Sequence, residues 1–443
     1  MEKVALRCDL CNGSLEMQPG GQTAICEFCG TKYSIGRLRE KIQEIRGTVS
    51  VEGVVKTTNA DFDIQAGVLL HYCGKETEVV IPEEVCEIGR SCFGEMKYLT
   101  SITLPEGLVR IADFAFSGCS GLTQITIPQG VTEIGRYAFS GCSGLKQITI
   151  PHVVTKINDG VFIGCSKLNQ ITIPQGVTKI SFEAFRGCSG LKQISIPQEV
   201  TWIGDRAFYG CSGLKQITIP QGITRIDDDV FNGCSGLTDI TIPQGVIKIG
   251  DRAFYGCSGL KQITLPQGLE ELGEHAFSDC SGLTQIAIPK GIKEIGNAFN
   301  GCSGLKQITI PQKAIKIGYR AFEGCSGLTQ ITVPHSVSEI GAYAFSGCFG
   351  LTELSLPASL STIGYHALAD CKNLTRINGI TEQHFLKLLR DSHKIDMFLN
   401  FELADCPLRR FIYRKQGRCQ SCGNEFEGLL SRRCRSCHKF KDY

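Results

Sequence analysis

Hydrophobic and polar positions along most of the chain repeat with a period of 23 residues. One copy, Gly-Leu-Thr-Gln-Ile-Thr-Ile-Pro-Gln-Gly-Val-Thr-Glu-Ile-Gly-Arg-Tyr-Ala-Phe-Ser-Gly-Cys, occupies residues 121–142, and close variants precede and follow it. Its phenylalanine recurs at Phe93, Phe116, Phe139, Phe162, Phe185, Phe208, Phe231, Phe254 and Phe277, and, after the loss of one residue, at Phe299, Phe322 and Phe345. A fixed period of this length predicts a solenoid of stacked repeats.

Each repeat predicts two short strands joined by turns. The first apolar run alternates through Ile125 and Ile127 and stops at Pro128, which has no N–H for a strand ladder. A second short run ends at Ile134, and the glycines around the repeat phenylalanine turn the chain back. One repeat alone buries too little apolar surface to offset the entropy of ordering it, so the repeats must stack. The sequence therefore predicts a mainly β solenoid of about 12–13 repeats of 23 residues.

The flanking segments predict ends for this solenoid. We expect the repeats to span residues 82–376, with an atypical N-terminal cap at 48–81 that covers the open first face. Residues 377–404 predict a helical C-terminal cap, and Thr381 is placed to cap the start of its helix. Residues 35–47 have apolar positions at helical spacing and predict a short linker helix.

The strand positions that point away from the predicted core form rows, and the longest row is glutamine. We take this row as a candidate partner-binding surface: Gln124, Gln147, Gln170, Gln193, Gln216, Gln262, Gln285, Gln307 and Gln330. An extended polar face suits a protein or glycan contacted at many points. The alternative is that Gln and Thr ladders satisfy one another by side-chain hydrogen bonds and serve only as a soluble scaffold.

Two departures from the repeat are further candidates. Trp202, the one tryptophan of the chain, stands at an outward position where other repeats carry Glu, Lys or Arg, and exposed tryptophan is favoured at binding hot spots. A single exposed tryptophan without a partner is the alternative. The run from Asp227 to Asp229 is expected to be a solvated loop, because three adjacent carboxylates do not converge easily on one cation.

The chain contains 24 cysteines, of which twelve belong to the repeat: Cys119, Cys142, Cys165, Cys188, Cys211, Cys234, Cys257, Cys280, Cys302, Cys325, Cys348 and Cys371. Neighbouring members of this row would stack with parallel Cβ vectors, which does not suit a disulfide. We expect them to be buried thiols that act as small hydrophobic side chains.

Eight other cysteines lie in four Cys-x-x-Cys pairs at the two ends: Cys8, Cys11, Cys26 and Cys29 in residues 1–34, and Cys419, Cys422, Cys434 and Cys437 in residues 405–443. Two such pairs can surround one tetrahedral Zn²⁺, and metal binding would supply folding energy to so short a segment. The N-terminal module resembles a bacterial zinc ribbon. The sequence predicts two structural zinc ions, with redox-active or incidental cysteines as the alternative.

The repeat motif Cys-x-x-Leu-x-x-Ile-x-Ile-Pro-x-x-Val-x-x-Ile-Gly-x-x-Ala-Phe resembles the BspA-like leucine-rich repeat over roughly residues 80–375. The resemblance implies a curved, right-handed leucine-rich-repeat solenoid and recognition of proteins or cell surfaces without catalysis. It also implies that the main sheet is concave, in which case the glutamine row would lie on the broad binding face. Many members of the family are secreted or anchored.

Charge and hydropathy narrow the function only a little. A formal net charge of +2 names no partner, and no apolar run approaches the ~20 residues of a membrane span. The first residues lack the apolar core of a signal peptide, so the cytoplasm is expected. No nucleophile–base pair emerges, and a zinc ion with four cysteine ligands has no open position, so we expect no enzyme.

The leading interpretation is a non-catalytic protein-interaction scaffold with two structural zinc sites and an unidentified protein ligand. A nucleic-acid-associated protein is the first alternative, because residues 405–443 carry ten Lys and Arg against four Asp and Glu. A cell-surface adhesin is the second alternative.

Overall fold

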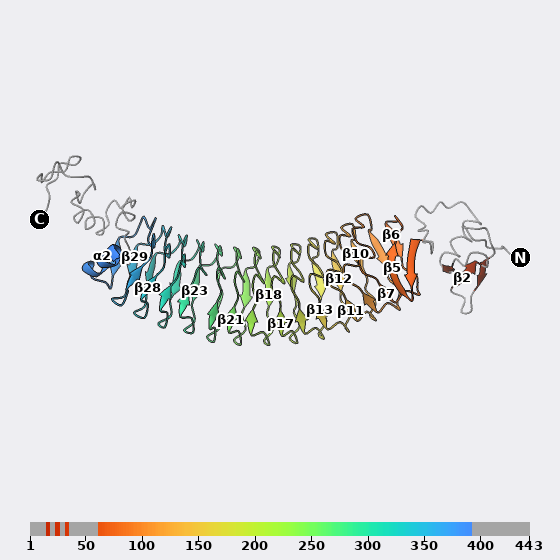
Figure 1. Ribbon diagram of the computed structural model, residues 1–443, viewed down its shortest axis with the longest axis horizontal. Helices are drawn as coiled ribbons and strands as arrows, with labels where there is room; N and C mark the ends of the chain where they lie inside the picture. Colours follow the sequence, from red (N-terminus) through yellow and green to blue (C-terminus); the bar gives the residue numbers. More distant parts are fainter. Residues whose placement is uncertain (1–14, 18–22, 27–31, 35–60, 392–443) are drawn as a thin grey trace, which may run out of the picture.

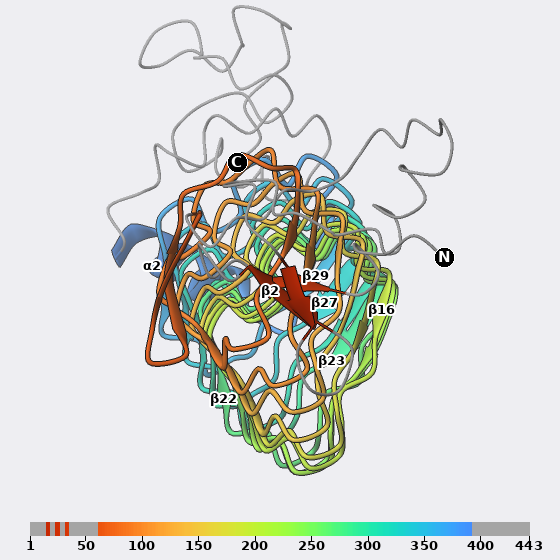
Figure 2. The same ribbon diagram turned by 90° about the vertical axis from the view of Figure 1, so that its right-hand side faces the viewer.

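The computed structural model describes residues 15–17, 23–26, 32–34 and 61–391. Residues 61–391 form one elongated, curved β solenoid of about 14 turns (Figure 1). This is slightly more than the sequence count of repeats, because the strand Glu78–Val80 precedes the first consensus repeat yet pairs in register with Ser101–Thr103. Viewed along the long axis, the turns lie over one another (Figure 2).

The first strand of each turn forms one side of the solenoid, which we call the first face. All its strand pairs are parallel. The strand ladder is interrupted between β14 and β16 and between β25 and β27, and between β20 and β23 it is reduced to the isolated bridge of Gln262 with Gln285. The strands are β6 (Glu78–Val80), β8 (Ser101–Thr103), β10 (Gln124–Ile125), β12 (Gln147–Thr149), β14 (Gln170–Thr172), β16 (Gln193–Ile194), β18 (Gln216–Thr218), β20 (Asp239–Thr241), β23 (Gln285–Ala287), β25 (Gln307–Thr309), β27 (Gln330–Thr332), β29 (Glu353–Ser355) and β31 (Arg376–Asn378).

The second strand of each turn forms the second face. Its sheets are also parallel, apart from the N-terminal hairpin, and are interrupted after β11, β17 and β22. The strands are β5 (Val68–Tyr72), β7 (Glu87–Ile88), β9 (Arg110–Ile111), β11 (Glu133–Ile134), β13 (Lys156–Ile157), β15 (Lys179–Ile180), β17 (Trp202–Ile203), β19 (Arg225–Ile226), β21 (Lys248–Ile249), β22 (Glu271–Leu272), β24 (Glu294–Ile295), β26 (Lys316–Ile317), β28 (Glu339–Ile340) and β30 (Thr362–Ile363).

A continuous row of stacked phenylalanine rings lies in the core. From Phe93 to Phe345, neighbouring ring centroids are 5.2–5.9 Å apart and the ring planes differ by only 1–17°. All of these side chains are fully buried. The separations lie within the range of offset-stacked aromatic pairs. The ring of each turn therefore packs against the rings before and after it, and no turn has a core of its own.

The twelve repeat cysteines are buried free thiols, as expected from the sequence. Each S–H donates to the carbonyl oxygen of a phenylalanine in the preceding turn, as Cys119 does to Phe93 at 3.0 Å and Cys165 to Phe139 at 3.2 Å. The same bond, at 3.0–3.2 Å, occurs along the whole row. The thiols thus connect consecutive turns as well as filling the core.

Different elements close the two ends of the solenoid. At the N-terminal end, β4 (Phe62–Gln65) pairs antiparallel with β5, and the Tyr72 ring lies 5.3 Å from Phe93, continuing the aromatic row. At the C-terminal end, α2 (Glu382–Asp391) contacts β30 and buries Phe385 and Leu388. The backbone N–H of His384 donates to the Thr381 hydroxyl at 3.3 Å, which is the helix cap that the sequence predicted.

A separate small sheet precedes the solenoid in the sequence. Its strands β1 (Leu15–Met17), β2 (Thr23–Cys26) and β3 (Lys32–Ser34) pair antiparallel in the order β1-β2-β3. The linker helix predicted at 35–47 lies outside the described residues.

The buried thiols predict a loss of stability at alkaline pH. Burial raises the pKa of Cys165 and of Cys211 to about 12, whereas a thiol in an unfolded chain ionises near pH ~8.5. The folded-state pKa is the higher one, so the stabilisation is complete below pH ~8.5 and is lost as pH rises toward 12, at ~1.4 kcal/mol per pH unit for each thiol.

We therefore expect the melting temperature, followed by circular dichroism with reductant present, to fall steeply above pH ~9. In Cys165→Ala/Cys211→Ala the fall should be shallower, even though the two cavities lower the melting temperature at neutral pH. Equal pH slopes for the two proteins would contradict the assignment.

Candidate binding faces

The structure places the glutamine row on the first face with every side chain exposed. Where the sheets are continuous, each glutamine stands directly opposite the next, as Gln124 does to Gln147, Gln147 to Gln170 and Gln193 to Gln216. The isoleucine that follows each glutamine points into the core, because side chains alternate along a strand. We call the nine exposed glutamines named above the glutamine face.

The side-chain amides of the glutamine face make no hydrogen bond to any described residue. Threonines in the neighbouring row instead bond to the main chain one turn back: the Thr123 hydroxyl donates to the Thr100 carbonyl at 3.3 Å, and Thr238 donates to Lys215 at 3.1 Å. The structure therefore lacks the mutual Gln–Thr ladder that the sequence left open. The glutamine amides keep their donors and acceptors for solvent or a partner.

A shallow trough runs across the middle of the first face. One hollow of about 630 Å³ is lined by outward residues of β14, β16, β18 and β20, with Gln170, Gln193, Gln216 and Asp239 among them. A second hollow of about 420 Å³ extends from Gln124 and shares the lining of β14 with the first. Together the two hollows follow six consecutive first-face strands, from β10 to β20.

Trp202 lies on the second face, opposite Lys179 of the preceding turn. Its side chain is 36% exposed, in agreement with the outward position inferred from the sequence. The indole Nε1 donates to Asp227 Oδ2 of the next turn at 2.9 Å. Asp227 also pairs with the Arg225 guanidinium. The ring is therefore fixed across two turns by a hydrogen bond to a buried carboxylate.

The expectation of a solvated Asp227–Asp229 loop is wrong for two of the three residues. Asp227 and Asp229 are only 5% and 6% exposed, and Asp228 alone is exposed. Asp229 accepts hydrogen bonds from Arg206 at 3.3 Å and from Asn232 at 2.7 Å. Both buried carboxylates are thus paired with cations, which is what makes their burial possible.

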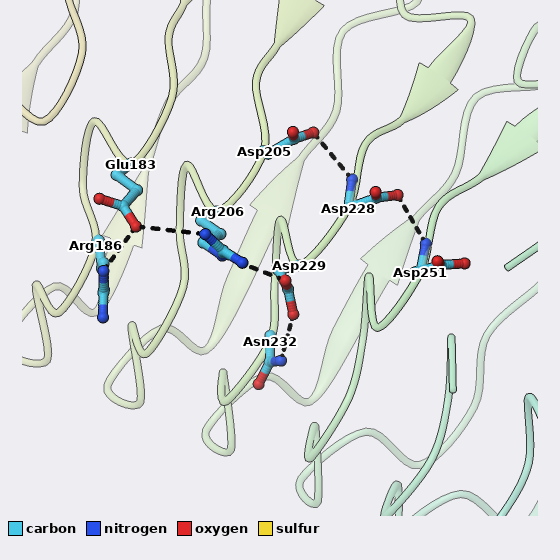
Figure 3. A network of polar contacts seen from close by, with 8 residues as sticks. All are labelled: Glu183, Arg186, Asp205, Arg206, Asp228, Asp229, Asn232 and Asp251. Atoms are coloured by element: carbon cyan, nitrogen blue, oxygen red, sulfur yellow. Dashed lines mark hydrogen bonds and ion pairs between the residues drawn. The ribbon is translucent and has the colours of Figure 1, made fainter. Parts of the chain in front are cut away.

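This network continues through neighbouring turns (Figure 3). Arg206 lies between Asp229 and the buried Glu183, which also pairs with Arg186 at 2.6 Å. Along the adjacent row, Asp205 Oδ1 accepts the main-chain N–H of Asp228 at 3.2 Å. These carboxylates therefore connect successive turns and are engaged within the fold.

Sequence position explains why Asp227 is unusual. It stands four residues before the repeat phenylalanine, where most repeats have glycine. Glycine fits there because the turns approach closely: a Cβ added at Gly135 would lie 2.5 Å from the main-chain carbon of Ala112, and one at Gly341 would lie 2.5 Å from that of Gly318. Asp227 has a side chain in place of this glycine, and β17 and β19 lie in different sheets at this point.

Most predicted zinc ligands lie outside the described part of the chain. Cys26 ends β2, opposite Leu15 of β1, and the other seven ligands fall in segments that the structure does not describe. Within the described residues, no group of three or more His, Cys, Asp or Glu side chains is arranged to hold a metal ion. The described residues likewise include no helix long and apolar enough to cross a bilayer.

Fold and repeat together define a leucine-rich-repeat solenoid. A family model described as "BspA type Leucine rich repeat region (6 copies)" matches residues 68–192, 178–305 and 296–384. The chain therefore belongs to the BspA-type leucine-rich repeat family, as its repeat motif suggested.

Several solved structures are similar to this chain. A leucine-rich repeat protein from Bacteroides ovatus is 28% identical, with a TM-score of 0.49, over 74% of this chain and 94% of that one. A leucine-rich cell-surface protein from Faecalibacterium prausnitzii is 25% identical, with a TM-score of 0.46, over 76% and 98% of the two chains. The pneumococcal vaccine antigen PcpA is 18% identical, with a TM-score of 0.47, over 86% and 96%. A search among curated proteins found no match.

The fixed orientation of Trp202 is testable by fluorescence, since the chain has a single tryptophan. In Asp227→Ala the indole N–H loses its acceptor, and we expect red-shifted emission, stronger acrylamide quenching and a stability loss of ~1.5–3 kcal/mol. Asp227→Asn retains an acceptor oxygen and should give a spectrum close to that of the unmodified protein. Identical spectra and quenching for all three proteins would show that Asp227 does not hold the ring.

Proposed function

We propose that the protein is a non-catalytic interaction scaffold that binds a protein partner on its first face. The observation that carries the proposal is the glutamine face: nine exposed amides, repeated turn after turn, whose hydrogen-bonding groups no described residue satisfies. Each amide offers two donors and an acceptor oxygen, so the face suits the N–H and C=O groups of a polypeptide.

The geometry favours an extended contact over a compact pocket. Neighbouring glutamines are separated by one strand spacing, ~4.8 Å, and the trough follows them along the solenoid axis. A net hydrogen bond contributes only ~0.5–1.5 kcal/mol, so useful affinity requires many such contacts along the face. A partner that lies across several turns satisfies this requirement.

Trp202 supplies a separate contact of a different kind. Because its indole is held by Asp227 at 2.9 Å, binding there would cost little side-chain entropy. Rigid, partly exposed aromatic side chains are common anchors in protein interfaces. We therefore include Trp202 as an anchor on the second face.

We also propose that both ends carry structural zinc modules. The pairing of β1 and β2 supports the N-terminal module. Leu15 stands opposite Cys26. Leu15 follows Cys11 by four residues in the sequence, and Cys26 precedes Cys29 by three. Ile25 of the same hairpin stands opposite Lys32 of β3. The register therefore supports a module in which the segments that adjoin the two Cys-x-x-Cys pairs are joined by one small sheet. The C-terminal module rests on the spacing of its cysteines.

We place the protein in the cytoplasm. Twelve described thiols donate to main-chain carbonyls and Cys73 and Cys86 are exposed free thiols, an arrangement suited to a reducing compartment. Cell fractionation tests this placement, and recovery at the cell surface would favour the adhesin alternative.

The glutamine face is tested by affinity capture with the full-length protein from a lysate of its own cells. Gln193→Ala/Gln216→Ala removes two amides that line the trough and should deplete the specific partners at least about fivefold, because each amide contributes ~0.5–1.5 kcal/mol. The matched control Gln244→Ala/Gln267→Ala deletes the same groups from exposed positions after the first-face strand and should retain them. If both variants capture the partners equally, the glutamine face is not the binding surface. If nuclease treatment abolishes capture, the nucleic-acid alternative is favoured.

The zinc modules predict about two zinc ions per full-length chain by elemental analysis after zinc-replete expression. Cys8→Ser/Cys11→Ser should lower this to about one, because two ligands of one tetrahedral site are lost. Cys73→Ser/Cys86→Ser changes two exposed thiols outside the four pairs and should leave the zinc content unchanged. Zinc content that is insensitive to the first variant would refute the N-terminal module.

A further inference from the structure

Charge is sorted between the two faces of the solenoid. In turns between residues 120 and 336, each first-face segment runs from the residue after the repeat cysteine to the second residue after the proline. These segments carry two acids, Glu199 and Asp239, and eight lysines: Lys146, Lys167, Lys192, Lys215, Lys261, Lys290, Lys306 and Lys313. The remaining segments of the same turns carry fourteen acids and eleven Lys and Arg. A net charge near zero thus conceals a cationic first face.

These eight lysines are uncompensated within the described structure. None of them forms an ion pair with a described residue. On the second face, by contrast, several charges pair between turns: Arg110 bonds to Glu87 at 2.7 Å and to Glu133 at 2.9 Å, and Lys248 pairs with Glu271 at 2.7 Å. The same repeat can therefore pair charges between turns, and among the described residues it does so on the second face and not for the eight first-face lysines.

Five of the eight lysines form a file along the edge of the glutamine face. Each immediately precedes a residue of the glutamine face: Lys146, Lys192, Lys215, Lys261 and Lys306. The main-chain N–H of Lys215 donates to the carbonyl of Lys192 at 2.9 Å, so these two residues occupy adjacent turns beside the trough. Like charges at this separation repel each other, and an anionic partner would remove that cost.

The composition of the face indicates which kind of polyanion fits. The first-face segments of these turns contain no arginine, phenylalanine, tyrosine or tryptophan. Proteins that bind single-stranded nucleic acid stack the bases on aromatic side chains and arginine. Lysine is instead a hydrated point charge that suits carboxylates in an exposed setting. The free glutamine amides beside the file suit the peptide groups of the same ligand.

The spacing of the file also suits an extended peptide. Lys146 and Lys192 are two turns apart, as are Lys215 and Lys261, and two strand spacings amount to ~9.6 Å. In a polyproline-II chain every third residue returns to the same side after ~9.3 Å. Carboxylates three residues apart can therefore meet lysines two turns apart, such as Lys146 and Lys192, while the peptide backbone faces the glutamines.

We propose that the first face binds an extended acidic polypeptide segment, whose carboxylates contact the lysine file and whose main chain contacts the glutamine face. The proposal rests on the function proposed above and adds the chemistry of the partner. Binding by exposed lysines depends on unscreened charge, so the affinity falls as salt is raised.

The test measures fluorescence anisotropy of a fluorescein-labelled poly-L-glutamate with the full-length protein at low and high salt. Lys192→Gln/Lys215→Gln should weaken binding by about fivefold, because two exposed ion pairs with the ligand are lost. The matched control is Lys156→Gln/Lys179→Gln, which removes two lysines that stand opposite each other in adjacent turns of the second face. It should bind as the unmodified protein does. Circular dichroism confirms that both variants remain folded.

Three outcomes would overturn the proposal. In the first, poly-L-glutamate does not bind at low salt. In the second, the two variants weaken poly-L-glutamate binding equally. In the third, single-stranded DNA or heparin binds in a way that depends on Lys192 and Lys215, while poly-L-glutamate fails to bind. If capture from lysate still depends on Gln193 and Gln216, only the acidic character of the partner is rejected. If that dependence is also absent, the proposed function fails as well.

Discussion

Contact between consecutive turns is the interaction on which this structure depends. The first- and second-face strands are only two or three residues long in almost every turn, and their ladder partners lie in the turns before and after. The phenylalanine rings, 5.2–5.9 Å apart, and the cysteine thiols follow the same rule. A turn removed from the stack would lose its hydrogen bonds and its apolar contacts together, so stability is a property of neighbouring pairs of turns.

Because the inward side chains make the contacts between turns, the outward positions are free to vary. Inward residues such as Ile148 and Phe139 must fit the turns on both sides, whereas Gln147 and Lys146 project away from the core. The second face uses part of that freedom for stability, through ladders such as Glu87–Arg110–Glu133. The first face does not, and the amides of the glutamine face and the eight lysines lack described partners. That contrast within one repeat is why we assign binding to the first face.

Features that repeat at one position per turn could be predicted from the sequence, and features that join different turns could not. Periodicity alone placed Phe139 and Cys142 in the core and Gln147 on the surface. The burial of Asp227 was missed because its partners depend on the stacking register: Trp202 lies 25 residues away and bonds to it across one turn. Three consecutive aspartates are locally so polar that the sequence favoured an exposed loop for Asp227. The sequence also could not show that the glutamine amides lack hydrogen-bond partners, since a row of Gln beside Thr is equally compatible with a mutual ladder.

Irregular turns solve a problem that a regular solenoid creates. A partner that contacted only repeated glutamines could shift by one turn, ~4.8 Å, and meet an almost identical surface, much as a strand with weakly specified register can slip. Most of the buried polar side chains interrupt this uniformity over a short stretch: Ser181 and Glu183 lie in one turn, and Asp227, Asp229 and Asn232 lie two turns later, with the turn of Trp202 between them. Across the core, the larger hollow of the first face spans Asn169 to Thr241 and coincides with the same turns. A buried ion pair is weak evidence for stability, so what these turns provide is one distinct position along an otherwise uniform surface.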